Sequence, residues 1–380
     1  MRGLRPTAAG PAEPDDALLT VSGATKAVES VLERVLDART RQAREVDAVF
    51  AHDIAVRVAA FVLRGGKRVR TGFVWCGWRA AGGSGDPAAV MRTAAALELL
   101  QACALIHDDV MDGSLLRRGS PAIHVEFAQR HRPGKGNGFA KSFGTSAAVL
   151  AGDLALAWAD DLLTETALGS PHGSSLFDEW RSMRGEMVAG QYRDIHAQAS
   201  GSGGVEEALT IATLKSALYT VARPMALGAS IAGADGRELT ALRAAGRCAG
   251  LAFQLRDDLL GAFGDPAVTG KPSDDDLRSR KLTYLLAVAL RLADAADDRD
   301  ATAVLAPGAQ TGADCGVERM RAALERTGAR SAVEAKIAEL SGAGRRHFAA
   351  SGACPAVRQE FAALVEQVSG VGSQHAEEIG

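Results

Sequence analysis

The chain has 380 residues, of which 47 % are hydrophobic and 5 % aromatic, and its formal net charge at pH 7 is −3. This length allows a large buried core in one to three domains, and the near-neutral charge argues against a nucleic-acid-binding protein, which usually carries a clear basic excess. No apolar run of about 18 residues is evident, which argues against a membrane span, and five scattered cysteines without a Cys-x-x-Cys pair are typical of free thiols in a reducing cytoplasm.

Residues 1–20 contain three prolines and lack the apolar core of a signal peptide, so we expect a disordered leader there. Beyond it, apolar side chains recur at the spacing of one helix face, beginning with Val28, Val31 and Leu32. Further helices are expected over residues 51–63, 67–82, 87–112, 121–130, 143–168, 174–199, 205–231, 236–262 and 274–293, with shorter ones to about residue 369. Strand signals are nearly absent. The sequence therefore predicts an all-α fold with one large domain over residues 21–375.

The helix over residues 87–112 is apolar almost all round, which is typical of a helix in the core. At about 100° per residue, its main polar side chains fall within roughly 100° of arc. They are Glu98, Gln101, Asp108, Asp109 and Asp112. A polar stripe on a buried helix must face an internal cavity or its own partners. The helix over residues 236–262 repeats this pattern, with Gln254 and Asp258 one turn apart.

These two helices each carry an aspartate cluster. One reads His-Asp-Asp-Val-Met-Asp and ends at Asp112, and the other reads Gln-Leu-Arg-Asp-Asp and ends at Asp258. Ionised carboxylates in apolar helices are costly unless a cation meets them. Two facing clusters indicate a shared polycation, most simply several magnesium ions, which prefer oxygen ligands. Helix capping or surface salt bridges would explain a single Asp-Asp pair, but they do not explain two clusters on buried helices.

Basic motifs accompany the aspartates. Residues 65–70 read Gly-Gly-Lys-Arg-Val-Arg and open a helix, where the glycines let a ligand approach and the helix N-terminus favours anions. A lone basic pair is more often a solvated face, and this motif lacks the Gly-Lys-Ser/Thr ending of a nucleotide P-loop. Further cations are Arg117, Arg118, Lys215, Lys271 and Lys281. In combination they predict a metal-held diphosphate beside a second anion site without metal.

No Ser-His-Asp or Cys-His nucleophile pattern stands out. His107 precedes the first aspartates but lies at a different angle on the helix, so we expect a packed or hydrogen-bonded core histidine. For His124 the sequence leaves two possibilities open, a loop position in the site or simple exposure to solvent.

Together these residues resemble the trans-isoprenyl diphosphate synthases, the polyprenyl synthetase family, over roughly residues 25–370. Residues 107–119 and 253–261 are similar to its two aspartate-rich motifs, and residues 65–70 to its Gly-Gly-Lys-Arg-x-Arg motif. Three further segments match: Gly190 to Asp194, Lys215-Ser216, and Gly270 to Pro272 with Lys281 to Thr283. The segment from Gly261 to Lys271 is most similar to bacterial geranylgeranyl diphosphate synthases. The resemblance implies an isoprenoid synthase bundle around a central apolar cavity.

Carried over position by position, the resemblance implies the following roles. Three magnesium ions per active site would be held by Asp108, Asp109, Asp112, Asp257 and Asp258. The catalytic residues would be Asp108, Asp112, Lys215, Gln254 and Asp257. The allylic diphosphate would contact Arg117, Lys215, Ser216, Lys271, Lys281, Gln191 and Gln254. Isopentenyl diphosphate would contact Lys67, Arg70, Gln101 and Arg118. Gly261 departs from the family pattern, because a third aspartate usually stands there; Asp265 is a candidate to compensate.

The implied reaction is head-to-tail condensation of isopentenyl diphosphate with an allylic (dimethylallyl, geranyl or farnesyl) diphosphate. The product tail would grow past Ala104 and Cys103, and because both are small we predict mainly geranylgeranyl diphosphate. Alternatives are a farnesyl or longer-chain synthase, a class I terpene cyclase, which would leave Lys67, Arg70 and Arg118 idle, and a non-catalytic subunit, which would tend to lose aspartates. The resemblance also implies a cytoplasmic homodimer.

Overall fold

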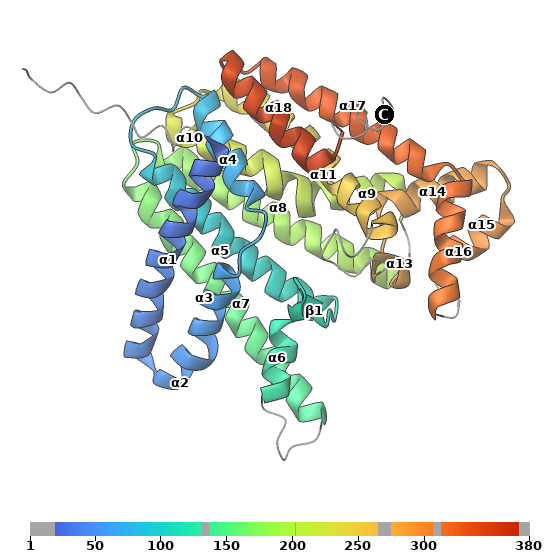
Figure 1. The fold of residues 1–380 in the computed structure, drawn as a ribbon, viewed down its shortest axis with the longest axis horizontal. Coiled ribbons are helices and arrows are strands. Elements are labelled where there is room, and N and C mark those ends of the chain that lie inside the picture. Colours follow the sequence, from blue (N-terminus) through green and yellow to red (C-terminus); the bar gives the residue numbers. More distant parts are fainter. Residues whose placement is uncertain (1–19, 131–136, 202, 265–274, 307–312, 372–380) are drawn as a thin grey trace, which may run out of the picture.

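The computed structural model describes residues 20–130, 137–201, 203–264, 275–306 and 313–371 (Figure 1). These residues are almost entirely helical, which confirms the all-α prediction. The only strands among them form a two-residue antiparallel hairpin, β1 (Leu116–Arg117) with β2 (Ser120–Pro121). Residues 1–19 of the predicted leader lie outside the described residues.

The first helices are α1 (Val21–Val46), α2 (Ala48–Phe50), the π-helix η2 (Ala51–Ala55), α3 (Val56–Leu63), α4 (Val69–Ala80), α5 (Ala88–Met111), α6 (Ile123–Arg130) and α7 (Asn137–Leu168). The middle of the chain forms α8 (Gly173–Ser200), α9 (Val205–Ala212), the π-helix η3 (Thr213–Ala222), α10 (Arg223–Ala232) and α11 (Gly236–Phe263). The remainder forms α13 (Asp275–Arg278), α14 (Tyr284–Ala295), α15 (Arg299–Leu305), α16 (Ala313–Arg326), α17 (Ala329–Ala349) and α18 (Pro355–Ser369).

One predicted helix is wrong. The sequence predicts a single helix over residues 274–293, but α13 ends at Arg278 and α14 begins at Tyr284. Thr283 caps the second helix, because its Oγ1 accepts a hydrogen bond from the backbone N–H of Leu286 at 3.2 Å. Lys281 lies in the break between the two helices, so its backbone is not part of either helix.

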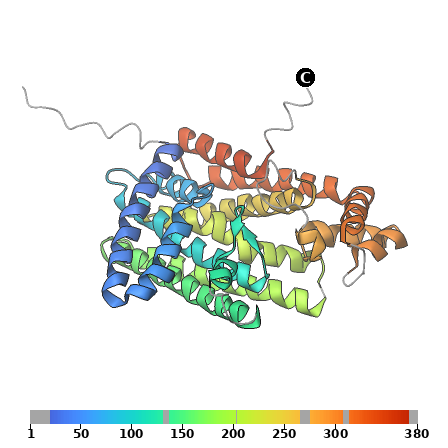
Figure 2. The same cartoon turned by 60° about the horizontal axis from the view of Figure 1, so that its bottom comes forward.

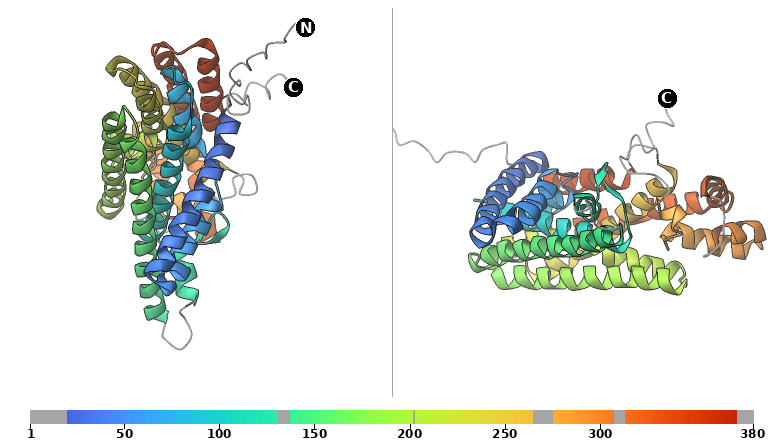
Figure 3. Two further views of the ribbon diagram at one scale, coloured as in Figure 1. Left: turned by 90° about the vertical axis from the view of Figure 1, so that its left-hand side faces the viewer. Right: turned by 90° about the horizontal axis from the view of Figure 1, so that it is seen from below.

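Buried apolar side chains form three clusters that share helices. The first lies among α1, α3, α4, α5, α7 and α8, the second among α9, α11 and α14 to α17, and the third among α4, α10, α11, α17 and α18. Helix α5 runs through the middle of the first cluster (Figure 3), as its apolar sequence predicts. Helices α14 to α16 lie at the opposite end of the molecule from α1 to α3 (Figures 1 and 2).

The predicted helix over residues 205–231 is continuous, but its middle is the π-helix η3, which lies between α8 and α11. Close approach requires glycine on both neighbours. A Cβ atom on Gly190 of α8 would lie 2.3 Å from the backbone nitrogen of Lys215, and one on Gly250 of α11 would lie 2.3 Å from the carbonyl oxygen of Ala217. These contacts fix the position of η3, and π-helical turns occur frequently at functional sites.

Two described helices, α5 and the Gly138–Leu168 part of α7, are long and apolar enough to cross a membrane by length and composition. Length and composition alone carry little weight, because the core helix of a globular protein passes the same test. In α5, 72 % of the most apolar window is buried inside the bundle.

Candidate active site

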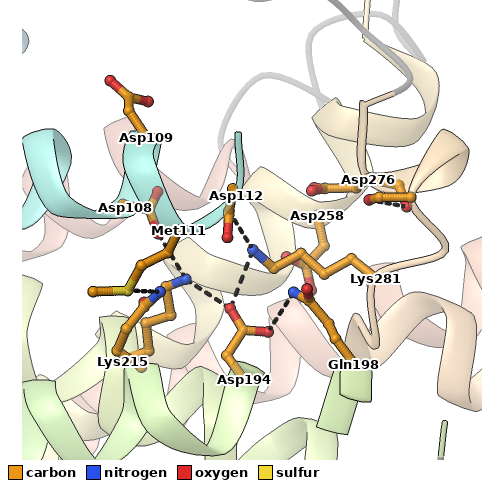
Figure 4. Close-up of polar contacts among 12 residues, drawn as sticks. Asp108, Asp109, Met111, Asp112, Asp194, Gln198, Lys215, Asp258, Asp276 and Lys281 are labelled. Carbon is orange, nitrogen blue, oxygen red and sulfur yellow. Dashed lines mark hydrogen bonds and ion pairs between the residues drawn. The ribbon is translucent and has the colours of Figure 1, made fainter. Parts of the chain in front are cut away.

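The first acidic cluster, Asp108 and Asp112, lies at the C-terminal end of α5. The alanine- and leucine-rich sequence favours a helix, and Gly113, with a φ of 65°, follows its C-cap Asp112. Each carboxylate meets a lysine from another element. Lys215 Nζ lies 3.1 Å from Asp108 Oδ1, and Lys281 Nζ lies 3.3 Å from Asp112 Oδ2 (Figure 4). Four of the predicted site residues therefore come together from distant parts of the chain.

Asp194 of α8 joins the two lysines. Its Oδ2 lies 2.6 Å from Lys215 Nζ and 3.1 Å from Lys281 Nζ, and only 2 % of its side chain is exposed. No role for Asp194 was predicted from the sequence, where the same motif yielded only Gln191. A signal was present, because Asp194 follows Gln191 by three residues and shares its face of the helix.

Charges in this network balance closely. Burial opposes ionisation of Asp108, but Lys215, Lys281 and Arg117 outweigh it and hold the pKa of this carboxyl below its usual range. The pKa of Asp194 is lowered in the same way, against burial, by Lys281 and Lys215. Burial alone would lower the pKa of Lys281, but the surrounding carboxylates raise it instead. The network is therefore a set of ionised groups held in fixed places.

Asp109 occupies the other side of α5 (Figure 4). It accepts a hydrogen bond from Arg117 Nε at 2.8 Å and a shorter one from Arg117 Nη2, and its residue is 1 % exposed. Burial raises the pKa of its carboxyl despite this partner. Arg117 Nη2 also lies 3.4 Å from Asp108 Oδ2. The geometry gives Asp109 a role in holding Arg117 beside Asp108, rather than a direct place among the facing carboxylates.

The second acidic cluster, Asp257 and Asp258, lies near the end of α11. Asp258 is buried, and its Oδ1 accepts a hydrogen bond from Gln254 Nε2 at 2.8 Å, as the one-turn spacing predicts. Burial raises the pKa of Asp258 to about 7, and the nearby carboxylates of Asp276 and Asp257 act in the same direction. This carboxyl is therefore balanced between its neutral and ionised forms near neutral pH.

Asp276 stands close to the position of the absent third aspartate. A Cβ atom on Gly261 would lie 3.3 Å from Asp276 Oδ2, so the glycine leaves room for a carboxylate that comes from α13. Asp276, Asp258 and Lys281 line one small pocket. No local pattern in the sequence singles out Asp276, because it approaches Gly261 only through the packing of α13 against α11. The other candidate, Asp265, lies outside the described residues.

The basic segment, residues 65–70, connects α3 to α4 and includes the first residues of α4. Arg118, from the loop after α5, contacts the carbonyl oxygen of Gly65 with its guanidinium group, and this side chain fills the space beside Gly66. Lys67 is exposed, while Gln101 of α5 is partly buried, and its Oε1 has no partner among the described residues. Arg118 is therefore brought to the basic segment that carries Lys67.

Arg70 connects this segment to η3. Its guanidinium group lies 4.2 Å from the centre of the Tyr219 ring, and Nη2 donates to Thr220 Oγ1 at 3.2 Å. The same π-helix carries Lys215 and Ser216. Consequently, η3 contacts both groups of predicted substrate ligands.

The remaining predicted residues have mixed outcomes. Gln191 Nε2 lies 3.5 Å from the sulfur of Met111, at the edge of the first acidic cluster. Lys271 lies outside the described residues. His107 is hydrogen-bonded, as expected, because Nε2 lies 3.1 Å from the carbonyl oxygen of Val149. His124 is partly buried, and burial, followed by Lys141, lowers its pKa.

The donors present fit magnesium in type. Within the described residues, no three His, Cys, Asp or Glu side chains are grouped closely enough to hold a metal ion by themselves. Magnesium, however, is commonly bound through one or two carboxylates, and substrate phosphate oxygens and water complete its shell. Asp112 at the end of α5 pairs with Lys281, which lines a small pocket with Asp258 of α11, so carboxylates of both clusters could provide such partial sites.

Comparison with known proteins adds to this geometry. A family model described as polyprenyl synthetase matches residues 53–317. Geranylgeranyl diphosphate synthase of Mycobacterium tuberculosis is 34 % identical over 273 residues, covering 69 % of each chain. The (2E,6E)-farnesyl diphosphate synthase of M. tuberculosis is 35 % identical over 218 residues, covering 57 % of this chain and 55 % of its own.

A solved structure extends the similarity over most of the chain. Geranylgeranyl pyrophosphate synthase of Corynebacterium glutamicum, in complex with isoprenyl diphosphate and magnesium, is 38 % identical. The match covers 91 % of this chain and 98 % of that protein, with a TM-score of 0.85.

Proposed function

The chain belongs to the polyprenyl synthetase family, and from this premise we propose how its residues perform prenyl transfer and which product it makes. It is a prenyltransferase that joins isopentenyl diphosphate head-to-tail to an allylic diphosphate and releases diphosphate. The main support for the residue roles is the network of Asp108, Asp112 and Asp194 with Lys215 and Lys281, which places fixed charges of both signs at the end of a core helix.

Lys215 and Lys281 bind the allylic diphosphate, and Lys271 adds a third positive charge. Asp194 holds the first two lysines in place, because it accepts a hydrogen bond from each. Arg117 also approaches the allylic diphosphate, and Asp109 fixes the orientation of the Arg117 side chain. Clustered cations stabilise the negative charge that develops on the leaving diphosphate.

Asp108, Asp112, Asp257 and Asp258 would hold three magnesium ions at this site, with Asp109 in a supporting position. When bound, magnesium supplies the positive charge that draws diphosphate from the allylic carbon. The corynebacterial relative was solved with magnesium, which supports this assignment. Asp276, beside Gly261, takes the place of the family's third aspartate.

Isopentenyl diphosphate binds at the basic segment. Lys67, Arg70, Gln101 and Arg118 provide its contacts. From there its double bond attacks the allylic carbon as diphosphate leaves, and the resulting carbocation loses a proton to the departing diphosphate. Gln191 and Gln254 line the site near the reacting group, and Ser216 lies beside Lys215. A terpene cyclase requires no second diphosphate, so the presence of Lys67, Arg70 and Arg118 favours chain elongation.

The main product is geranylgeranyl diphosphate, made in the cytoplasm. Cys103 and Ala104 lie about one turn before Asp108, and their small side chains let the tail pass. Further along α5, Leu97 and Leu100 are fully buried, and the Trp75 and Trp78 rings lie 5.0 Å apart nearby in the same core cluster. We expect these larger side chains to limit the length of the tail.

The product length is tested with Ala104→Phe. The aromatic ring fills the path of the tail, so the main product shortens from twenty to fifteen carbons while isopentenyl diphosphate is still consumed. Purified protein is incubated with magnesium, isopentenyl diphosphate and each allylic starter, and products are sized by mass spectrometry. An unchanged product distribution would show that the tail runs elsewhere, and a cyclic hydrocarbon product from the unmodified protein would favour the cyclase.

A homodimer buries the outer faces of α7 and α8, which lie side by side (Figure 3). Val149 and Leu150 of α7 are 41 % and 61 % exposed, and Val188, Tyr192 and Ile195 of α8 form an exposed stripe at helical spacing. Contiguous exposed apolar side chains mark interaction surfaces. Sedimentation velocity of the protein tests this assignment.

A further inference from the structure

Arg68 adopts a backbone conformation that ordinary residues avoid. Its φ is 47° and its ψ is 33°, in the left-handed region, at the N-cap of α4. A residue with a side chain is strained in this backbone region, so the surrounding structure must hold it there. Arg68 directly follows Lys67 and precedes Arg70 by two residues, so its conformation determines how both cations are presented.

The Arg68 side chain is buried and anchored to two helices. Its Nη1 forms an ion pair with Glu98 Oε2, and the two side chains are 4 % and 5 % exposed. Its Nη2 donates to the carbonyl oxygen of Val62, in α3, at 2.9 Å. Glu98 precedes Gln101 by three residues on α5, so the ion pair connects the basic segment to the helix that carries another predicted ligand of the same substrate.

Stability alone explains this arrangement poorly. Two charges that leave water lose hydration, and well-packed apolar residues often serve a core equally well or better. A glycine at residue 68 would also adopt the left-handed conformation without strain. What the pair provides is a fixed geometry: the segment is tied to α3 and α5 through Arg68, while Arg118 contacts Gly65.

We propose that Arg68 and Glu98 form a positioning pair that orients Lys67 and Arg70 toward the diphosphate of isopentenyl diphosphate. Neither member touches the substrate, and both act through the backbone of the basic segment. The inference rests on the proposed function, since it assumes that Lys67 and Arg70 bind this second diphosphate. It predicts that loss of the pair weakens the binding of isopentenyl diphosphate and leaves the binding of the allylic diphosphate unchanged.

Glu98→Gln tests the pair with little change in volume. Without its carboxylate partner, Arg68 no longer fixes the segment, and a misplacement of about 1 Å can cost on the order of 100-fold in catalysis. The KM for isopentenyl diphosphate should rise by about tenfold or more, while the KM for geranyl diphosphate stays unchanged. An equal rise in both KM values, or no rise in either, would overturn the proposal.

Glu179→Gln is the matched control. Glu179 of α8 is equally buried, at 4 % side-chain exposure, and it pairs with Arg223 and Arg243. Its loss should lower the free energy of unfolding, but by less than Glu98→Gln does, because Arg223 keeps Glu186 as a partner and 41 % of the Arg243 side chain is exposed. The ratio of the two KM values should remain that of the unmodified protein. A change of the ratio in this variant would make the effect general and defeat the inference.

The double variant Arg68→Met/Glu98→Met separates positioning from packing. It removes both charges together, so the free energy of unfolding should recover relative to Glu98→Gln, as seen when buried pairs are replaced by apolar residues. The KM for isopentenyl diphosphate should stay high, because the segment has lost its anchor. Recovery of both quantities would show that the pair only fills the core.

Lys67→Ala distinguishes failure of this inference from failure of the proposed function. If Lys67→Ala raises the KM for isopentenyl diphosphate and Glu98→Gln does not, the substrate assignment stands and the positioning pair is rejected. If Lys67→Ala leaves this KM unchanged, the assignment of the basic segment is wrong, and the positioning pair is rejected with it.

Discussion

The two acidic clusters sit in different electrostatic environments, although both lie near the ends of core helices. In the first, burial disfavours charge on Asp108, but three neighbouring cations outweigh it and its pKa falls. In the second, burial dominates at Asp258, and its pKa rises to about 7. No described cation forms an ion pair with Asp258. Asp108 is therefore ionised before any ligand binds, whereas Asp258 is only partly ionised near neutral pH, and an added cation would favour its charged form.

The largest expected effect breaks the first cluster. Asp108→Asn keeps the shape of the side chain but removes the charge that faces Lys215, so turnover should fall by on the order of 1,000-fold. The lowered pKa of Asp108 means that its ionised form stabilises the fold, so the free energy of unfolding without magnesium should also fall. Turnover is measured by the release of diphosphate, and the free energy of unfolding is measured by urea denaturation.

Asp178→Asn serves as the control for this variant. Asp178 also lies in a helix, α8, but 68 % of its side chain is exposed and its partner is the exposed Arg181. Turnover and stability should both stay near those of the unmodified protein. Near-normal turnover in Asp108→Asn would contradict the assignment of the first cluster.

Most of the first cluster could be predicted from sequence, and the reason is local. Helical spacing alone places Asp108 and Asp112 on one face of a helix whose apolar composition puts it in the core. The positions of the lysines that face these aspartates cannot be predicted from helical spacing. Lys281 reaches Asp112 because residues 279–283 interrupt a helix that periodicity predicts to be continuous, and the Thr283 cap that restarts it is a weak signal.

The parts that escaped prediction depend on contacts between helices. Asp194 gains its importance only because α8 and η3 approach closely at Gly190, and no local pattern reports that approach. Likewise, Asp276 comes into reach of the second cluster only because Gly261 leaves space for it. Tertiary contacts of this kind change which residues meet without changing the periodicity of either segment.

A second prediction concerns a variant in which the carboxyl pKa of Asp108 should rise, as that of Asp258 does in the second cluster. Lys215→Gln removes the cation that hydrogen-bonds both Asp108 and Asp194, so desolvation is less well opposed and the pKa of each carboxyl should rise. Turnover should fall by about 100-fold, and the KM for the allylic diphosphate should rise more than that for isopentenyl diphosphate.

Lys26→Gln is the control, because Lys26 is exposed on α1. Steady-state kinetics with each substrate varied in turn provide the measurement. If Lys215→Gln instead raised only the KM for isopentenyl diphosphate, η3 would belong to the other diphosphate site.

The smallest expected effect concerns the second cluster and has the opposite sign for stability. The folded-state pKa of Asp258, about 7, lies above its ordinary value of 3.8, so the folded protein binds this proton more tightly than the unfolded chain does. The free energy of unfolding therefore falls as the pH rises from about 4 to about 7, and this contribution levels off above that range. Asp258→Asn removes the titration. In EDTA at pH 8 the variant should be more stable than the unmodified protein, by roughly 2 to 4 kcal/mol at most, and the difference should shrink by pH 5.

Asp108→Asn, measured under the same conditions, should lose stability where Asp258→Asn gains it, so that one chemical change has opposite effects at the two clusters. Urea unfolding at both pH values gives this contrast directly. Asp258→Asn should also slow turnover by about tenfold, because the added cation loses a charged ligand. If Asp258→Asn were less stable than the unmodified protein at pH 8, its carboxylate would already be neutralised by a protein cation, and the two clusters would share one electrostatic design.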